Sequence, residues 1–178
     1  MLKDVKEILY TEEQIRDKVK ELGSQISKDY EGKEVVLIGI LKGCVVFMSD
    51  LMKEISIPCG MDFMAVSSYG KSTQTSGVVK IVKDLDMDIE GKEVLIVEDI
   101  IDSGVTLKYL MDYLTRRKPA GIKIACLLNK QERRIADIKV DYLGFNIPDY
   151  FIIGYGLDFA EKYRNLPFIG VLKEEVYS

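Results

Sequence analysis

The hydrophobic positions of this chain change several times between helical spacing and short, continuously apolar runs. Thr11 and Gln14 form a capping-box pattern at the start of the first periodic segment. Four apolar residues then repeat at the spacing of one helix face: Ile15, Val19, Leu22 and Ile26. The segment 35–41, VVLIGIL, is instead continuously apolar and rich in β-branched residues, which indicates a strand buried on both faces.

The same two patterns alternate along the rest of the chain. Further helices are predicted over 44–55 and 105–116, and further strands over 58–66, 78–82, 94–97, 122–128, 142–147 and 151–155. Apolar strands that alternate with helices predict an α/β fold with a mostly parallel sheet flanked by helices. The sequence contains no internal repeat and no linker, so residues 1–178 are expected to form a single domain.

Composition narrows the class of protein. Of the 178 residues, 47% are hydrophobic and 30% are charged, and the net charge is −4. These values are typical of a soluble globular protein and lack the basic excess that binding to a nucleic-acid backbone requires. No apolar run approaches the length of a membrane span, and the first residues lack the apolar core of a signal peptide. We therefore expect a cytoplasmic protein that binds neither nucleic acid nor membranes.

The chain contains no histidine, which restricts its possible chemistry. Catalytic triads and zinc sites that depend on histidine are excluded, so acid–base chemistry falls to Asp, Glu, Lys, Tyr or Cys. The three cysteines, Cys44, Cys59 and Cys126, are widely spaced and lie in or beside apolar segments. They are expected to be reduced thiols in the core.

In a parallel sheet, ligands bind at the carboxyl ends of the strands, so the residues that end the apolar runs matter most. One run continues into VEDIIDSGVTL and delivers two adjacent carboxylates, Glu98 and Asp99. Gly104 then allows a tight loop before a helix, where backbone N–H groups can hold a phosphate. The hydroxyls of Ser103 and Thr106 can add further donors. Two acids beside a phosphate site imply a ligand that also carries hydroxyls or a Mg²⁺ ion.

This segment resembles the motif that binds phosphoribosyl pyrophosphate (PRPP) in type I phosphoribosyltransferases. The surrounding sequence is similar to the hypoxanthine-guanine branch of that family at four places: LKG at 41–43, SSYG at 67–70, LLNK at 127–130 and PDYFIIGYGLDFAEKYRNL at 148–166. Each match is weak alone, but their order around the PRPP motif makes the resemblance specific, and it covers nearly the whole chain. It implies the type I fold, with a small hood formed by the N-terminal and C-terminal segments.

The resemblance implies roles for the residues of the PRPP motif. Glu98 and Asp99 would contact the ribose hydroxyls or Mg²⁺, and Asp102 would be the general base. Four residues would hold the 5′-phosphate: Ser103, Gly104, Val105 and Thr106. Val105 stands where some relatives have Lys, but the loop acts chiefly through its backbone, so little change is expected. The alternative, in which Asp102 merely caps the following helix, leaves Glu98 and Asp99 unexplained.

The resemblance also assigns the purine and pyrophosphate contacts. Lys130 would donate to O6 of a 6-oxopurine, Phe151 would stack on the base, and the backbone carbonyl of Ile152 would accept from an exocyclic group. Three further residues complete the set: Asp158 at the purine and beside a second Mg²⁺, and Lys42 with Gly43 at the pyrophosphate. Arg164 would also contact the pyrophosphate, which suits a guanidinium group.

Two structural features follow from the same resemblance. The peptide bond between Leu41 and Lys42 is expected to be cis. The polar stretch 67–77 is expected to be a mobile loop, in which Ser68 and Tyr69 belong to a lid that closes over the site and excludes water.

The implied reaction transfers the phosphoribosyl group of PRPP, with Mg²⁺, to N9 of hypoxanthine or guanine. The products would be inosine or guanosine monophosphate and pyrophosphate, and the family suggests a homodimer or homotetramer. The residues alone leave the preference among hypoxanthine, guanine and xanthine open, because all three carry O6.

Three other interpretations are weaker. Residues 65–72 read A-x-x-x-x-G-K-S, one residue from a nucleotide-binding P-loop, but the first glycine is missing and the following residues are poor helix formers. The acidic stretch 84–88 hints at a calcium loop, but positions six and twelve are Ile89 and Leu95. A PRPP-type regulator that binds RNA or DNA would need a basic surface, which the composition does not indicate.

Overall fold

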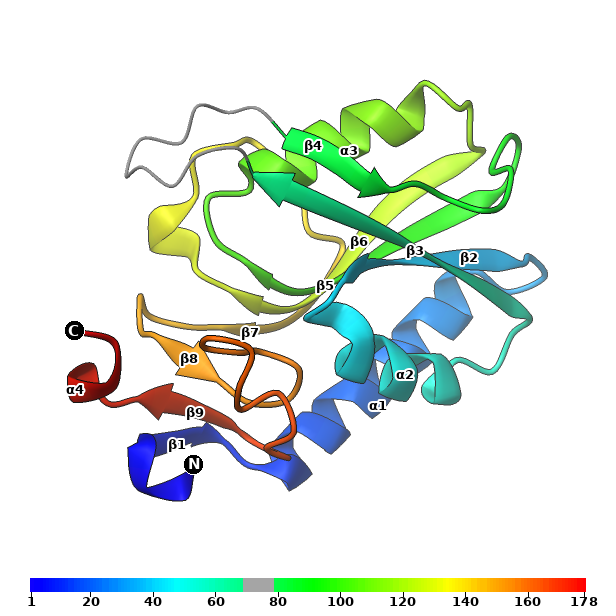
Figure 1. Ribbon diagram of the computed structural model, residues 1–178. Helices are drawn as coiled ribbons and strands as arrows, with labels where there is room; N and C mark the ends of the chain where they lie inside the picture. The colour runs from blue at the N-terminus through cyan, green and yellow to red at the C-terminus, as the bar shows by residue number, and fades with distance from the viewer. Residues whose placement is uncertain (69–78) are drawn as a thin grey trace.

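The computed structural model describes residues 1–68 and 79–178, and a six-stranded sheet runs through its centre (Figure 1). The strand order is β4-β3-β2-β5-β6-β7. The strands are β2 (Val35–Leu41), β3 (Cys59–Ser68), β4 (Val79–Lys83), β5 (Glu93–Ile101), β6 (Gly121–Asn129) and β7 (Tyr142–Asn146). All neighbours pair in parallel except β4, which lies antiparallel to β3 at the edge. The predicted α/β fold with a mostly parallel sheet is confirmed.

Helices cover both faces of this sheet, which explains why its central strands consist mostly of apolar residues. Helices α1 (Glu12–Asp29) and α2 (Cys44–Glu54) pack on one face, and α3 (Val105–Thr115) packs on the other (Figure 1). The first six residues of β2 are all buried. The predicted capping box of α1 is present, because Thr11 Oγ1 accepts from the Gln14 amide and Gln14 Oε1 accepts from the Thr11 amide.

A second, three-stranded sheet joins the two ends of the chain. Its order is β1-β9-β8, from β1 (Val5–Tyr10), β9 (Ile169–Leu172) and β8 (Ile152–Ile153), with the short helix α4 (Glu174–Tyr177) after β9 (Figure 1). This is the hood expected from the N-terminal and C-terminal segments. Short 3-10 turns precede β1 (η1, Leu2–Asp4) and follow β6 (η2, Gln131–Arg133).

The sequence pattern was wrong about parts of the hood. It did not predict β1 or β9, and it extended the strand at 151–155 too far. Strand β8 ends at Ile153 because Gly154 and Tyr155 have φ values of +95° and +49°, which are incompatible with an extended strand.

Most other boundaries agree within two residues; the largest difference is at β5, which continues to Ile101, four residues beyond the predicted end at Val97. Strand β3 continues to Ser68, so the backbone of Ser68 belongs to the sheet instead of a loop. Tyr69 and most of the stretch 67–77 lie outside the described residues. Within residues 1–68 and 79–178, no helix is both long and apolar enough to cross a membrane.

Candidate active site

Three neighbouring parallel strands bring the predicted residues to one edge of the sheet. Lys42 follows β2, Asp99 lies near the end of β5, and Lys130 follows β6. Residues Gly39 and Val97 are paired in register, as are Ile101 and Asn129. The carboxyl ends of these strands therefore meet, as the sequence predicted.

The backbone at Gly43 lies directly against the carboxylate of Asp99. A Cβ atom on Gly43 would sit 1.8 Å from Asp99 Oδ2, so only glycine fits there without movement. Asp99 is buried, and its Oδ1 accepts a hydrogen bond of 2.9 Å from the Ile100 amide. The peptide bond between Leu41 and Lys42 is cis, which confirms the prediction.

Glu98 and Asp99 have perturbed acidities. Burial raises the pKa of Glu98 well above its ordinary value, and the neighbouring Asp99 charge adds to the effect. Burial also raises the pKa of Asp99 to about 6, against the opposing influence of the Ile100 amide and the Arg164 charge, while Asp158 raises it further. These two carboxyl groups are therefore destabilised as anions until a positive charge comes near them.

Arg164 makes three contacts within the loop between β8 and β9. Its Nη2 lies 2.9 Å from Asp158 Oδ1 and 3.5 Å from Glu161 Oε1, and its Nη1 donates to the Gly156 carbonyl at 2.7 Å. Glu161 also pairs with Lys42, with 3.0 Å between Oε2 and Nζ. The sequence did not single out Glu161, which contacts both cations expected to bind pyrophosphate.

The loop before α3 has the geometry expected of a phosphate site. Gly104 is the N-cap residue with a φ of +79°, and helix α3 begins at Val105, with Thr106 in its first turn. The Val105 amide donates to Ser103 Oγ at 3.4 Å. No side chain in the described residues caps this helix, so Asp102 is not the cap that the alternative interpretation proposed. The first N–H groups of α3 suit an anion.

Lys130 is buried, and a chain of ion pairs connects it to Asp102. Lys130 Nζ lies 3.1 Å from Asp149 Oδ1, and Arg133 Nη1 lies 3.3 Å from Asp149 Oδ2. Arg133 Nε then approaches Asp102 Oδ1 at 2.8 Å. This last contact is an ion pair without a hydrogen bond, since the buried Oδ1 of Asp102 receives no hydrogen bond. Sequence reasoning missed Arg133 and Asp149.

Phe151 lies exposed immediately before β8 and belongs to an aromatic cluster. Its ring stacks on Tyr177 with centroids 4.7 Å apart and meets Phe159 edge-on at 5.3 Å. Ile152 is buried and pairs with Val171 of β9. Phe151 is thus held by the C-terminal segment and sits two residues after Asp149.

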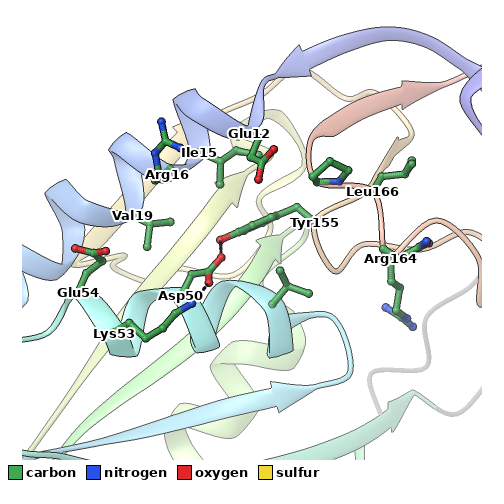
Figure 2. Close-up of a pocket in the computed structure, with 13 residues that line it drawn as sticks. Glu12, Ile15, Arg16, Val19, Asp50, Lys53, Glu54, Tyr155, Arg164 and Leu166 are labelled. Carbon is green, nitrogen blue, oxygen red and sulfur yellow. Dashed lines mark hydrogen bonds and ion pairs between the residues drawn. The ribbon is translucent and has the colours of Figure 1, made fainter.

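A separate hollow of about 440 Å³ lies between α1, α2 and the segment before β9 (Figure 2). Arg164 lines it, but none of the other predicted site residues does. In it the Tyr155 hydroxyl donates to Asp50 Oδ2 at 2.7 Å, and charges of both signs surround the pair. The predicted site is therefore not this hollow but the strand edge beside it.

The carboxylates at the edge fit a Mg²⁺ ion that a phosphorylated ligand also binds. The described residues contain no group of three or more acidic or cysteine side chains that could hold a metal alone. Mg²⁺ usually keeps several waters and takes one or two protein carboxylates together with substrate phosphates. The raised pKa values of Glu98 and Asp99 are consistent with a place where a cation is expected to offset their charge.

Comparison with known proteins defines the class. The phosphoribosyl transferase domain family matches residues 5–160, most of the chain. A protein of this class moves a phosphoribosyl group between substrates.

Individual relatives narrow the class further. The chain is 55% identical over 177 residues to a hypoxanthine-guanine phosphoribosyltransferase of Bacillus subtilis, covering 99% of this chain and 98% of that one. It is 54% identical over 176 residues to the enzyme of the same name from Streptococcus thermophilus, covering 99% and 98% respectively. A crystal structure of a hypoxanthine phosphoribosyltransferase from Staphylococcus aureus matches with a TM-score of 0.97 and 54% identity, over 100% of this chain and 97% of that one.

The chain therefore belongs to the hypoxanthine-guanine phosphoribosyltransferases of the type I phosphoribosyltransferase family. It is an enzyme of purine salvage that transfers a phosphoribosyl group to hypoxanthine or guanine. Enzymes of this family generally use metal ions.

Proposed function

We propose that the enzyme uses PRPP with Mg²⁺ as the donor and forms inosine or guanosine monophosphate plus pyrophosphate. The bond between C1′ and the pyrophosphate oxygen breaks, and a bond between C1′ and N9 of the purine forms. The proton that leaves the purine ring goes to the carboxylate of Asp102. The observation that carries this proposal is the buried Lys130, which lies at a strand end in the same chain of charges as Asp102.

The donor would occupy the edge formed by the ends of β2 and β5. Asp99 and Glu98 would hold the ribose hydroxyls or the metal, and Asp158 would hold a metal directly or through water. Four residues would hold the 5′-phosphate through backbone N–H groups and hydroxyls: Ser103, Gly104, Val105 and Thr106. We call Lys42, Gly43, Asp99, Asp158 and Arg164 the pyrophosphate region, since the leaving group would lie there.

Positive charge develops on the ribose as the pyrophosphate leaves, and the chain supplies groups for both partners. Arg164 and Lys42 are cations at the place proposed for the leaving anion, which they would stabilise as its charge grows. When bound, Mg²⁺ supplies further positive charge that neutralises the pyrophosphate. Asp99 would hold the ribose so that C1′ faces the purine nitrogen.

The purine would lie between Phe151 and the Asp102 loop. We call Asp102, Lys130, Arg133 and Asp149 the purine region. Lys130 has three N–H donors and no acceptor, so it favours the O6 of a 6-oxopurine and disfavours the amino group of adenine. Phe151 would stack on the base, and the carbonyl of Ile152 would accept from its exocyclic group.

The remaining expectations complete the proposal. Ser68 and Tyr69 would belong to a lid that excludes water from C1′ and so suppresses hydrolysis of PRPP. The chain would act as a single domain in a cytoplasmic homodimer or homotetramer. Light scattering of the purified enzyme tests the oligomeric state, and a monomer at micromolar concentration would reject it.

An ultraviolet assay of the purified enzyme with PRPP and Mg²⁺ tests the function. Hypoxanthine and guanine should be converted and adenine should not. Equal turnover of adenine would reject the role of Lys130. No turnover of any base, with PRPP still bound in a calorimeter, would point to a PRPP-binding regulator instead.

A further inference from the structure

Arg133 and Asp149 have no individual role in the proposed reaction. They lie between Asp102, the proposed general base, and Lys130, which is proposed to recognise the purine. Arg133 Nη1 lies 3.4 Å and 3.3 Å from the two carboxylate oxygens of Asp149, and Arg133 Nε lies 2.8 Å from Asp102 Oδ1. Lys130 Nζ donates to Asp149 Oδ1 at 3.1 Å. Asp102 and Lys130 are therefore connected through Arg133 and Asp149 without any ligand.

Ion pairs at this level of exposure are weak by themselves. The side chains of Asp102, Arg133 and Asp149 are 47%, 52% and 43% exposed, and exposed pairs contribute little because water screens them. These ion pairs alone would not hold Arg133 beside Asp102, so its backbone must be held there by other contacts.

The backbone of residues 130–136 is fastened on both sides of Asp102. The Lys130 amide donates to the Ile101 carbonyl at 2.9 Å. The amides of residues 135 and 136 both donate to the Ser103 carbonyl, at 2.9 Å and 3.0 Å. Arg133 lies between these anchors in the turn η2, where its own amide donates to the Lys130 carbonyl at 3.1 Å. The backbone position of Arg133 is thus set by main-chain hydrogen bonds, and from there its side chain reaches Asp102.

The two oxygens of Asp102 are not equivalent. Oδ1 is buried at the contact with Arg133, although the Asp102 side chain as a whole is about half exposed. The exposure must therefore lie on the rest of the side chain, which includes Oδ2. Oδ2 is the oxygen left to take a proton from a ligand.

Asp149 contacts Lys130 through a hydrogen bond, which Lys130 Nζ donates to Asp149 Oδ1 at 3.1 Å. The hydrogen bond from Lys130 is the main cause that lowers the pKa of Asp149, with Arg133 contributing, so Asp149 stays ionised. Since an ammonium has three donors, Lys130 keeps two of them for a ligand while Asp149 holds the third.

We propose that Arg133 and Asp149 are positioning residues of the purine region. Arg133 holds Oδ1 of Asp102 so that Oδ2 faces the purine proton, and Asp149 holds the ammonium of Lys130 at the place of O6. The inference rests on the proposed roles of Asp102 and Lys130. It implies that the distance between the group that reads the base and the group that deprotonates it is fixed before the base binds.

A double-mutant cycle tests the role of Arg133. Arg133→Gln is expected to lower kcat about 10-fold with an unchanged KM for PRPP, and Arg133→Lys is expected to restore part of the loss. In an Asp102→Asn background, Arg133→Gln should cost nothing further, because the carboxylate that it orients is gone. Equal losses in both backgrounds, or no loss in the wild-type background, would overturn the proposal.

Asp149→Asn tests the proposed role of Asp149 in positioning Lys130. It should raise the KM for hypoxanthine about 5-fold to 10-fold while leaving the KM for PRPP unchanged, since one neutral amide replaces the carboxylate that holds Lys130. The matched control is Glu132→Gln, which removes an exposed carboxylate from the same turn and should change neither constant. Equal effects on both substrates, or none, would reject the role of Asp149.

Failure of this inference can be told apart from failure of the proposed function. If the wild-type enzyme converts hypoxanthine and Asp102→Asn does not, but the Arg133 and Asp149 variants behave as wild type, only the positioning role is lost. If Asp102→Asn is itself fully active, the proposed function of Asp102 fails first. Thermal unfolding of each variant should match wild type, and variants that unfold early would be replaced by Arg133→Lys and Asp149→Glu in the same assays.

Discussion

The pyrophosphate region and the purine region are built in different ways from the same edge of the sheet. In the pyrophosphate region, the main chain is closely packed: Gly43 meets the Asp99 carboxylate, and a Cβ on Gly156 would lie 2.3 Å from the Gly43 carbonyl oxygen. In the purine region, ion pairs link the half-exposed side chains of Asp102, Arg133 and Asp149, and main-chain hydrogen bonds hold the segment 130–136 that carries Arg133. Enzyme activity should therefore be sensitive to added side-chain volume in the pyrophosphate region and to the loss of a charge in the purine region.

The largest effect is expected from Asp102→Asn, which keeps the volume and removes the charge. Loss of a general base usually costs about 10²-fold to 10⁴-fold in rate, and kcat should fall by that amount in the ultraviolet assay. The KM for PRPP should stay within about 2-fold, because Asn keeps the loop that follows it. Turnover near the wild-type rate would remove Asp102 from the reaction.

Gly43→Ala adds side-chain volume to the pyrophosphate region. Its Cβ would overlap Asp99 Oδ2, so the loop or the carboxylate must move, and misplacement by about 1 Å can cost about 10²-fold. The expected result is a loss of that size in kcat/KM for PRPP. The control is Gly60→Ala, whose nearest neighbour would lie 4.0 Å away and which should behave as wild type. A fully active Gly43→Ala enzyme would contradict the tight packing.

Lys130→Ala removes a charge from the purine region. A hydrogen bond to a charged group contributes about 1.5–3 kcal/mol, which corresponds to roughly 10-fold to 100-fold in affinity. The KM for hypoxanthine should rise by that factor in steady-state assays. If it rose less than about 2-fold, the buried ammonium would not be the group that reads O6.

Asp99→Asn should stabilise the metal-free protein while it weakens PRPP binding. The pKa of Asp99 is about 6 in the folded protein, above the ordinary value of 3.8, so ionisation is opposed by the fold. The fold favours the protonated carboxyl group, so the stability that Asp99 contributes is fully present below pH 3.8 and is lost as the pH rises through 6. Since one pKa unit corresponds to about 1.4 kcal/mol, the variant should gain about 1–3 kcal/mol at pH 7.

Calorimetric unfolding in the presence of a chelator measures that gain. The difference between Asp99→Asn and wild type should be clear at pH 7 and much smaller at pH 4.5. A difference that does not change with pH would mean that the ionisation of Asp99 is not its cause.

The smallest effect is expected from Glu161→Gln. Glu161 pairs with Lys42 and Arg164, so it occupies both cations before pyrophosphate binds. Its removal should tighten pyrophosphate binding by about 2-fold to 5-fold, the range of an exposed ion pair. Isothermal titration with pyrophosphate checks this, with the exposed and distant Glu31→Gln as control. Weaker binding in Glu161→Gln would show that Glu161 supports the site instead of competing for it.

The sequence predicted the central sheet well because its strands are marked by local composition. Strands β2 and β6 are apolar runs whose burial requires helices on both faces. Strand β1 has no buried residue, and it is held by pairing with β9 from the other end of the chain, as between Val5 and Leu172. No local pattern marks such a strand.

The candidate site likewise contains some residues that a local sequence pattern marks and others that no local pattern marks. The ends of apolar runs located Lys42, Asp99 and Lys130, and the structure brings these ends together. Glu161 and Asp149 are ordinary surface carboxylates in the sequence, and their importance comes from partners such as Lys42, which is 119 residues from Glu161. The pairing of distant charges depends on the completed fold and could not be inferred from spacing.

The most direct test of the division between the two regions is a calorimetric titration of Lys130→Ala with PRPP and Mg²⁺. If the purine region reads only the base, the Kd for PRPP should stay within about 2-fold of wild type while the KM for hypoxanthine rises at least about 10-fold. Equal losses for both ligands would contradict the account, because Lys130 would then act on the whole site instead of on the purine.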